Sequence, residues 1–114
     1  VLDVLEREKL RENADRVGAY LRSGLESLAD RHRLIGDVRG AGLFVGVELV
    51  RDRKTLEPAK EETHAIVNGM REDGVLVGIE GAHRNVLKMR PPLVFSKANA
   101  DQLIASLDRA LEAI

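Results

Sequence analysis

Three amphipathic helical stretches alternate with two pairs of short β-rich runs along the 114 residues of the chain. The predicted helices cover residues 1–29, 59–73 and 97–114, and the predicted strands cover residues 34–39, 43–50, 75–79 and 85–95. The order α-β-β-α-β-β-α predicts an α+β fold, a small two-layer sandwich in which a mainly antiparallel sheet carries helices mostly on one face. This length is that of a single domain, residues 1–114.

Apolar residues recur at steps of three and four in each predicted helix, which gives each helix one buried stripe. Asp3 and Glu6 are predicted to cap the first helix as a capping box, and the apolar start of the chain hints at an excerpt from a longer protein. Gly74 is predicted to end the second helix and Ser96 to cap the third. The inward residues are predicted to be Leu10, Ala14, Val17, Leu21, Leu25 and Leu28, then Thr63, Ile66, Val67 and Met70, and finally Ala100, Leu103, Ile104, Leu107, Leu111 and Ile114.

Glycines between the first two strands predict a hairpin with its turn at residues 40–42. In the second strand Leu43, Val45, Val47 and Leu49 share one face, and Phe44, Gly46 and Glu48 share the other. The glycine spacing misses the dinucleotide-binding fingerprint by one residue and leads into a strand, so that function is excluded. The turn has two interpretations: it bends the chain tightly, or it approaches the entrance of an active site.

Two cations lie on one face of the predicted strand at 85–95, which stops at a double proline. Lys88 and Arg90 point the same way and lie about 7 Å apart along the strand. Such a pair can cradle an anion that offers more than one oxygen, such as a carboxylate or a phosphate. The alternative is an exposed sheet face on which both cations only contact solvent.

Composition excludes several classes of function. The net charge is −1 with both signs interspersed, and only three residues are aromatic, so a nucleic-acid partner is not expected. No apolar run is long enough to span a membrane, and the absence of cysteine is typical of a cytoplasmic protein.

Residue types that carry catalysis are present but lack partners in the sequence. His32, His64 and His83 have no acidic companion at metal-ligand spacing, so no metal site is predicted. Glu61 and Glu62 are adjacent on a helix and are predicted to form a solvated face. Of five lysines only Lys88 lies in a plausible site.

Three segments together resemble class III aminotransferases, pyridoxal-phosphate enzymes of fold type I. Residues 38–48 (VRGAGLFVGVE) resemble the family's V-R-G-x-G-L-x-x-G-[IV]-E segment, and residues 85–93 (NVLKMRPPL) resemble N-V-[IL]-[RK]-x-x-P-P-L near its C-terminus. Residues 1–14 look like the long helix that leads into the C-terminal domain. The order and spacing fit across essentially the whole chain.

The resemblance implies a C-terminal domain whose large cofactor-binding domain lies outside this chain. The Schiff-base lysine is then expected in that missing domain, so no residue here is assigned as catalytic, no cofactor is expected on the fragment alone, and the fragment is expected to be inactive. The parent is expected to be a homodimer that holds pyridoxal 5'-phosphate and acts on a small amine or amino acid. Its expected reaction is the transfer of an amino group from an amino acid or ω-amine to a 2-oxo acid.

Lys88 occupies a position where many family members have an arginine that pairs with the substrate carboxylate. Lysine offers a point charge instead of a planar fork, which is a departure from the family's pattern. Residues 81–92 are closer to the branch that contains phospho-lyases acting on phosphoethanolamine or phosphohydroxylysine. The resemblance thus leaves two reactions open, transamination and phosphate elimination, with Lys88 and Arg90 as candidate substrate-binding residues.

Arg90 also has a structural interpretation, as a residue at the end of the strand. Two other classes of protein stay open from the residues alone. One is a free-standing module that binds a regulatory anion through the same two cations, without catalysis. The other is a purely structural dimerisation domain.

Overall fold

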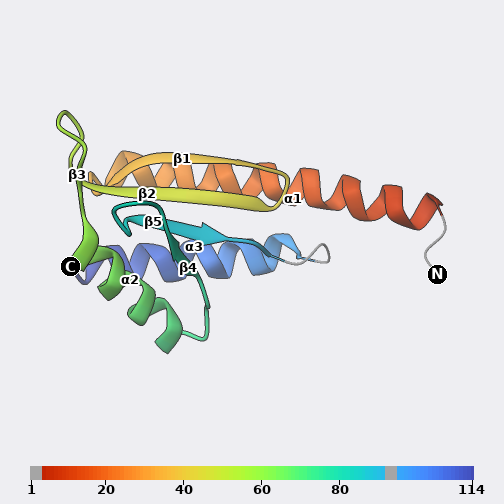
Figure 1. The fold of residues 1–114 in the computed structure, drawn as a ribbon. Coiled ribbons are helices and arrows are strands. Elements are labelled where there is room, and N and C mark those ends of the chain that lie inside the picture. The colour runs from red at the N-terminus through yellow and green to blue at the C-terminus, as the bar shows by residue number, and fades with distance from the viewer. Residues whose placement is uncertain (1–3, 92–94) are drawn as a thin grey trace.

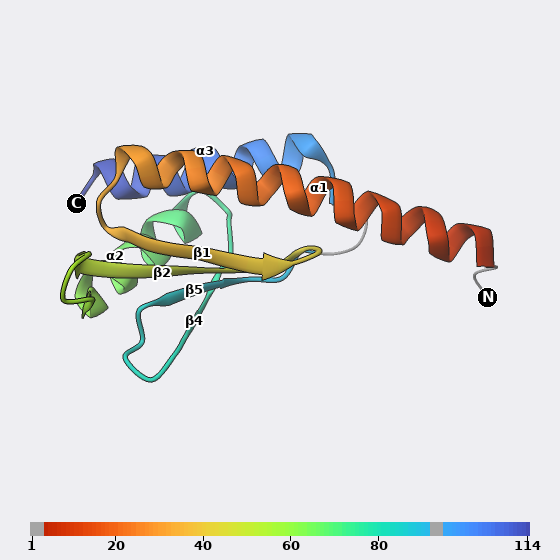
Figure 2. The ribbon, with the colours of Figure 1, turned by 90° about the horizontal axis from the view of Figure 1, so that it is seen from above.

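The fold is a two-layer α+β sandwich, described by a computed structural model for residues 4–91 and 95–114. Helices α1 (Val4–Arg31), α2 (Lys60–Glu72) and α3 (Lys97–Glu112) pack against a five-stranded antiparallel sheet, and Figures 1 and 2 show α1 and α3 on one side of it. Residues from all three helices and from the facing side of the sheet form a single apolar core. The predicted fold class and order of elements are confirmed.

The sheet brings together strands that are far apart in the sequence. Its strands are β1 (Ile35–Ala41), β2 (Phe44–Asp52), β3 (Glu57–Pro58), β4 (Gly78–Glu80) and β5 (Val86–Met89). The order across the sheet is β1-β2-β5-β4, and the short β3 pairs with the end of β2. Strand β3 lies between the predicted second strand and the predicted second helix, where the sequence pattern predicts neither a helix nor a strand. The candidate strand β5 is therefore central, between β2 and β4.

Helix α1 buries the predicted stripe and runs two residues beyond its predicted end at Ala29. Ala14, Val17, Leu21, Leu25 and Leu28 are at most 6% exposed, whereas Leu10 is half-buried. The guanidinium of Arg53 donates to the carbonyl oxygens of Ala29 and His32 at 2.5 and 3.2 Å, which satisfies groups that a helix end leaves free. The predicted cap at Asp3 lies outside the described residues.

The predicted strand at residues 75–79 is wrong at its start, since β4 begins only at Gly78. Gly74 has a φ of +82°, and its N–H and that of Val75 donate to the carbonyl oxygens of Arg71 and Met70. These two bonds form a Schellman motif, which confirms Gly74 as the end of α2 and uses the N–H of Val75. Leu76 is 81% exposed, because the chain has not yet reached the edge of the sheet.

The ends of β5 and α3 also depart from prediction. Strand β5 covers only Val86–Met89 of the predicted stretch, so Arg90 follows the strand, and residues 92–94 lie outside the description. Ser96 caps α3, as predicted, and it forms a capping box with Asn99 that the sequence analysis did not predict. Ile114 was predicted to point inward but is 57% exposed, because α3 ends two residues earlier.

Candidate functional site

The sheet has one face covered by helices and one face that bears charged side chains, here named the open face. The alternation along β5 separates the two faces. Leu87 and Met89 are 0% and 2% exposed under the helices, while Lys88 between them lies on the open face. Figure 2 shows α1 and α3 together on one side of the sheet. The structure thus confirms that the predicted candidate residue Lys88 points away from the core.

Lys88 makes two contacts on the open face. Its ammonium Nζ lies 2.7 Å from Oε1 of Glu80 on the neighbouring strand β4. The same atom lies 5.8 Å from the centre of the Phe44 ring on β2, within the range of a cation–π contact. About a third of the Lys88 side chain is exposed, so both its partners and solvent can reach the ammonium group.

Arg90 contacts the same aromatic ring as Lys88. Its Cζ lies 5.1 Å from the ring centre of Phe44. Among the residues that the structure describes, Arg90 has no carboxylate within ion-pair distance. Sequence reasoning placed Phe44 on the open face but did not identify it as a site residue. The alternation of side chains along β2 could have identified Phe44, because Phe44 precedes the buried Val45 and so lies on the opposite face of the sheet.

Lys88 has a glycine beside it on both neighbouring strands. In the antiparallel registers, Gly46 of β2 and Gly78 of β4 are its direct partners. Neither partner has a side chain to fill the space next to the lysine. On the Gly46 side, a hollow of about 470 Å³ lies on the open face, lined by Arg39, Gly40, Phe44, Gly46, Glu80, Gly81, Val86 and Lys88.

A third cation stands at the rim of this hollow. Arg39 donates to Asp37 at 2.8 Å and to Glu48 at 3.4 Å. The hydrogen bond to Asp37 and the charge of Glu48 raise the pKa of Arg39 above its ordinary value, so Arg39 is permanently charged. Because Arg39 also belongs to the hairpin, the open face carries cations from both sides of Phe44.

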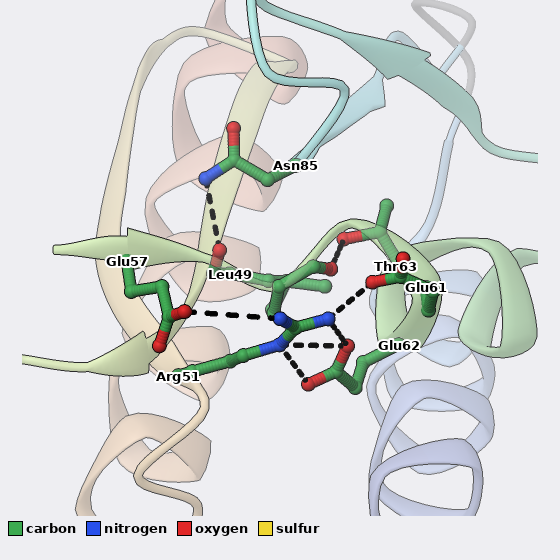
Figure 3. Close-up of polar contacts among 8 residues, drawn as sticks. Leu49, Arg51, Glu57, Glu61, Glu62, Thr63 and Asn85 are labelled. Carbon is green, nitrogen blue, oxygen red and sulfur yellow. Dashed lines mark hydrogen bonds and ion pairs between the residues drawn. The ribbon is translucent and has the colours of Figure 1, made fainter.

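The register that positions Lys88 is held by a buried side-chain amide. Asn85, only 6% exposed, donates from Nδ2 to the carbonyl oxygen of Leu49 at 2.9 Å (Figure 3). The N–H of Leu49 donates back to the carbonyl oxygen of Asn85 at 2.7 Å. This reciprocal pair joins the start of β5 to β2. It therefore fixes where Lys88 lies, three residues further along.

A second polar cluster lies at the other end of β2 and serves the fold. Arg51 binds Glu62 at 2.9 Å and also Glu61, and it lies 3.9 Å from Glu57 of β3 (Figure 3). Hydrogen bonding to Arg51 lowers the pKa of Glu62. The predicted solvated face is confirmed for Glu61, whose side chain is 78% exposed, whereas the side chain of Glu62 is only 21% exposed beside Arg51.

His32 has an acidic partner that its sequence neighbours do not reveal. Its Nε2 lies 2.7 Å from Oδ1 of Asp108, and Arg31 approaches the other oxygen to 3.5 Å. Glu112 adds a third ligand-type atom within 4.8 Å of the others. Hydrogen bonding to His32 lowers the pKa of Asp108. Since Arg31 and His32 already contact the two carboxylate oxygens of Asp108, we interpret this cluster as a polar contact that joins the ends of α1 and α3.

The fold and the open face together define a small α+β domain that presents basic side chains beside a hollow. The sequence of residues 1–111 matches the family Aminotransferase class-III, and the chain belongs to that family. The curated relatives include alanine–glyoxylate aminotransferase 2 homolog 2, mitochondrial, of Arabidopsis thaliana, which is 50% identical over 97% of this chain and 23% of its own length. Ethanolamine-phosphate phospho-lyase homolog 1 of Caenorhabditis elegans is 38% identical over 97% of this chain and 24% of its own length.

Solved structures of both reaction types share the fold. An Arthrobacter phospholyase in complex with phosphoethanolamine superposes with a TM-score of 0.89 and 42% identity, over 96% of this chain and 26% of the other. A Bacillus anthracis aminotransferase superposes with the same TM-score of 0.89 and 37% identity, over 97% of this chain and 26% of the other. The chain therefore spans about a quarter of the proteins it matches.

The family depends on pyridoxal phosphate, and an amine transaminase from an uncultivated Pseudomonas species has been solved in its cofactor-bound form. The lysines of this chain do not fit the role of cofactor anchor, which requires a desolvated amine. Lys9, Lys54, Lys60 and Lys97 are exposed, and Lys88 is ion-paired with Glu80. In the described part of the chain, no helix is long and apolar enough to cross a membrane.

Proposed function

We propose that this chain is the C-terminal domain of a pyridoxal-phosphate-dependent class III enzyme whose large cofactor domain lies elsewhere in the parent protein. The parent transfers an amino group from an amino acid or ω-amine to a 2-oxo acid. The bound cofactor acts as the electron sink for that reaction. Relatives about four times as long as this chain support the larger parent.

In this proposal the open face forms one wall of the active site. The observation that carries it is the convergence of Lys88 and Arg90 over the single ring of Phe44, beside a hollow. Lys88 binds the anionic end of the substrate and thereby orients the amine toward the cofactor. Arg90 supports the same anion from the end of the strand. An exposed ion pair such as that of Lys88 with Glu80 contributes only about 0 to 1 kcal/mol, so a substrate anion can replace Glu80.

The parent is proposed to be a homodimer in the cytoplasm that completes its active site between two subunits. The family resemblance supports the dimer, and the lack of cysteine in these residues supports a reducing compartment. The name of the Arabidopsis relative includes the word mitochondrial, so the compartment stays a prediction for this protein.

A second candidate function is phosphate elimination from a phosphorylated amine. Two cations that contact one aromatic ring suit a doubly charged ligand group better than they suit a single carboxylate. The Arthrobacter phospholyase and the nematode phospho-lyase homolog are relatives whose names carry this chemistry. A taurine–pyruvate aminotransferase of Bilophila wadsworthia, 38% identical over 99% of this chain, represents the transfer reaction.

The test uses the full-length parent loaded with cofactor and mixed separately with β-alanine, taurine and phosphoethanolamine. Released phosphate and the cofactor's absorbance are followed together. Conversion of the cofactor to its amine form without phosphate supports transamination. Phosphate release without that conversion supports the lyase. A parent that binds no cofactor, or reacts with no amine, contradicts both.

A further inference from the structure

The segment that leads from α2 into β4 has the side-chain pattern of a strand but no strand beside it. Val75 and Val77 are half-buried against the core, and Leu76 between them is 81% exposed. The same alternation continues through β4. Side chains that alternate in this way indicate an extended backbone. Within the described part of the chain, the N–H groups of Leu76 and Val77 make no backbone hydrogen bond.

Strand β5 cannot serve as the partner of this segment. In the register of β4 with β5, Gly78 pairs with Lys88, so an extension of the ladder would place Pro91 opposite Val75. Proline has no N–H group to donate and ends such a ladder. The pairing does stop at Gly78 and Lys88. Beyond that pair, a cavity of about 300 Å³ is lined by residues 74–77, the end of β5 and the first half of α3.

The two outer strands of the sheet differ in the charges that they carry. The order β1-β2-β5-β4 places β1 and β4 at the edges. Charged side chains on an edge strand oppose the addition of another strand. Strand β1 carries Asp37 and Arg39, which form an ion pair at 2.8 Å. Residues 75–79 carry no charge, and Leu76 is the most exposed large apolar side chain among the described residues. Such an edge favours the addition of a strand.

We propose that residues 75–79 are a docking edge, onto which an extended segment of the parent's own chain from outside residues 1–114 adds as a further strand. This inference rests on the proposed function, in which about three quarters of the parent lies outside these residues. The added segment accepts hydrogen bonds from the N–H groups of Leu76 and Val77. One of its apolar side chains covers Leu76, which removes the exposed apolar surface from water.

A segment of the same chain fits this edge better than a second copy of the domain does. Two copies related by a two-fold axis at Val77 would pair with Glu80 of each copy opposite Gly74 and next to Asp73 of the other. Like charges at such positions oppose pairing. A segment that belongs to the same chain also avoids the loss of translational and rotational freedom that joining two molecules costs.

The test replaces Leu76 with the photo-cross-linking amino acid p-benzoylphenylalanine in the cofactor-loaded parent. Leu56 is the matched control, because it is also an exposed leucine and lies in the turn before β3. The protein is assembled from a mixture of ordinary and isotope-labelled subunits. Mass spectrometry of the cross-linked peptides then separates contacts within one chain from contacts between two.

Hydrogen exchange of the unsubstituted parent is measured alongside, because it needs no change at the docking edge. If the added strand is present, the amides of Leu76 and Val77 exchange about tenfold or more slowly than the amide of Ala82. Ala82 is an exposed residue in the turn after β4 and serves as the reference for an open backbone.

The expected result is a cross-link from position 76 to a residue of the same chain outside residues 1–114, together with slow exchange at Leu76 and Val77. The Leu56 control forms no such cross-link. A cross-link from position 76 to the other subunit assigns the edge to pairing between copies and overturns the inference. A cross-link confined to residues 1–114 also overturns it.

Fast exchange at Leu76 and Val77 overturns the inference as well, since it shows a backbone without an added strand. Where the bulky side chain at position 76 prevents docking and no cross-link forms, the exchange of the unsubstituted parent alone decides. Failure of the proposed function is seen separately, as a parent that reacts with no amine in the cofactor assay, because cross-linking and exchange do not depend on turnover.

Discussion

The ammonium group of Lys88 lies 2.7 Å from a carboxylate oxygen of Glu80, across the pairing of β5 with β4. The two residues are not direct partners in the register, since Glu80 pairs with Val86 and Lys88 pairs with Gly78. The lysine side chain therefore reaches diagonally from β5 to Glu80 on β4. Its direct partner Gly78 has no side chain that could block this contact. The candidate anion-binding group therefore has an internal anion as its resting partner, and substrate binding is an exchange of one anion for another.

Replacing Lys88 with alanine separates substrate placement from support of the fold. We expect KM for an anionic amine to rise about tenfold or more in Lys88→Ala, because a hydrogen bond to a charged group contributes about 1.5 to 3 kcal/mol. The melting temperature of the parent should stay near the wild-type value, since the side chain is on the open face. Lys88→Arg should restore part of the affinity, and Lys54→Ala, an exposed lysine in the turn before β3, serves as the control. Loss of folding with unchanged KM would assign Lys88 to the scaffold.

Removing the charge of Glu80 should strengthen anion binding. In Glu80→Gln the competing carboxylate is gone, and an exposed pair of this kind contributes up to about 1 kcal/mol, so the dissociation constant for the substrate anion should fall by up to about fivefold. The gain should shrink at high salt, because both partners are solvent-exposed. Affinity that stays the same, or falls, would mean that Glu80 helps to shape the bound state. Calorimetric titration at two ionic strengths distinguishes these results.

The periodic features of the sequence predicted the elements that the structure contains. The stripe from Ala14 to Leu28 and the alternation of Leu87, Lys88 and Met89 depend only on local geometry, so they could be read directly. Strand β3 has two residues and exists only because it pairs with β2. The start of β4 was misplaced because Val75 is bonded to the end of α2.

The contacts of the candidate site could be predicted only in part. The sequence placed Lys88 and Arg90 on one face, but it could not supply their partners Phe44 and Glu80. Those pairings depend on the register between strands that are tens of residues apart. The same limit applies to His32, whose acidic companion is 76 positions away. A strand register that pairs Lys88 with the glycine of β2 would have indicated the hollow.

Two helical glycines should respond in opposite directions to the same substitution. Gly18→Ala should lower stability by about 2 to 3 kcal/mol, because the new Cβ would lie 1.9 Å from the backbone oxygen of Gly42, which cannot move without disturbing the hairpin turn. Gly69→Ala should instead raise stability, by up to about 1 kcal/mol, since it improves helix propensity and adds only an ordinary contact. Thermal melting of the two variants checks this pair. A well-tolerated Gly18→Ala would contradict the close approach of α1 to the turn.

The pairing of Asp108 with His32 predicts a dependence of stability on pH. The bond to His32 lowers the pKa of Asp108 from its ordinary value of 3.8. A carboxyl group whose pKa is lower in the folded state stabilises the fold above its unfolded pKa, and this contribution is lost as the pH falls through the folded pKa. We therefore expect Asp108→Asn to have a lower free energy of unfolding than the wild type between about pH 5 and 7, where the carboxylate is charged in both the folded and the unfolded state.

The same difference should narrow as the pH falls below about 4, because the Asp108 carboxyl group becomes protonated first in the unfolded chain and then, at lower pH, in the folded protein. Unfolding midpoints measured across this range for the wild type, Asp108→Asn and the control Asp30→Asn check the prediction. Asp30 is an exposed carboxylate near the same helix end, with no ion pair among the described residues. A difference that stays constant down to acidic pH would show that the loss arises from packing and not from the charge of Asp108.

The most direct test of the central claim is whether bound substrate shields Lys88. The cofactor-loaded parent is treated briefly with an amine-acylating reagent, with and without a saturating amount of ethyl phosphate or ethanesulfonate, and each lysine is quantified by peptide mass spectrometry. The account predicts that the anion lowers the labelling of Lys88 while that of the exposed Lys54 stays the same. Equal labelling of Lys88 in both samples, at an anion concentration shown by calorimetry to saturate the protein, would contradict the assignment of the open face to the active site.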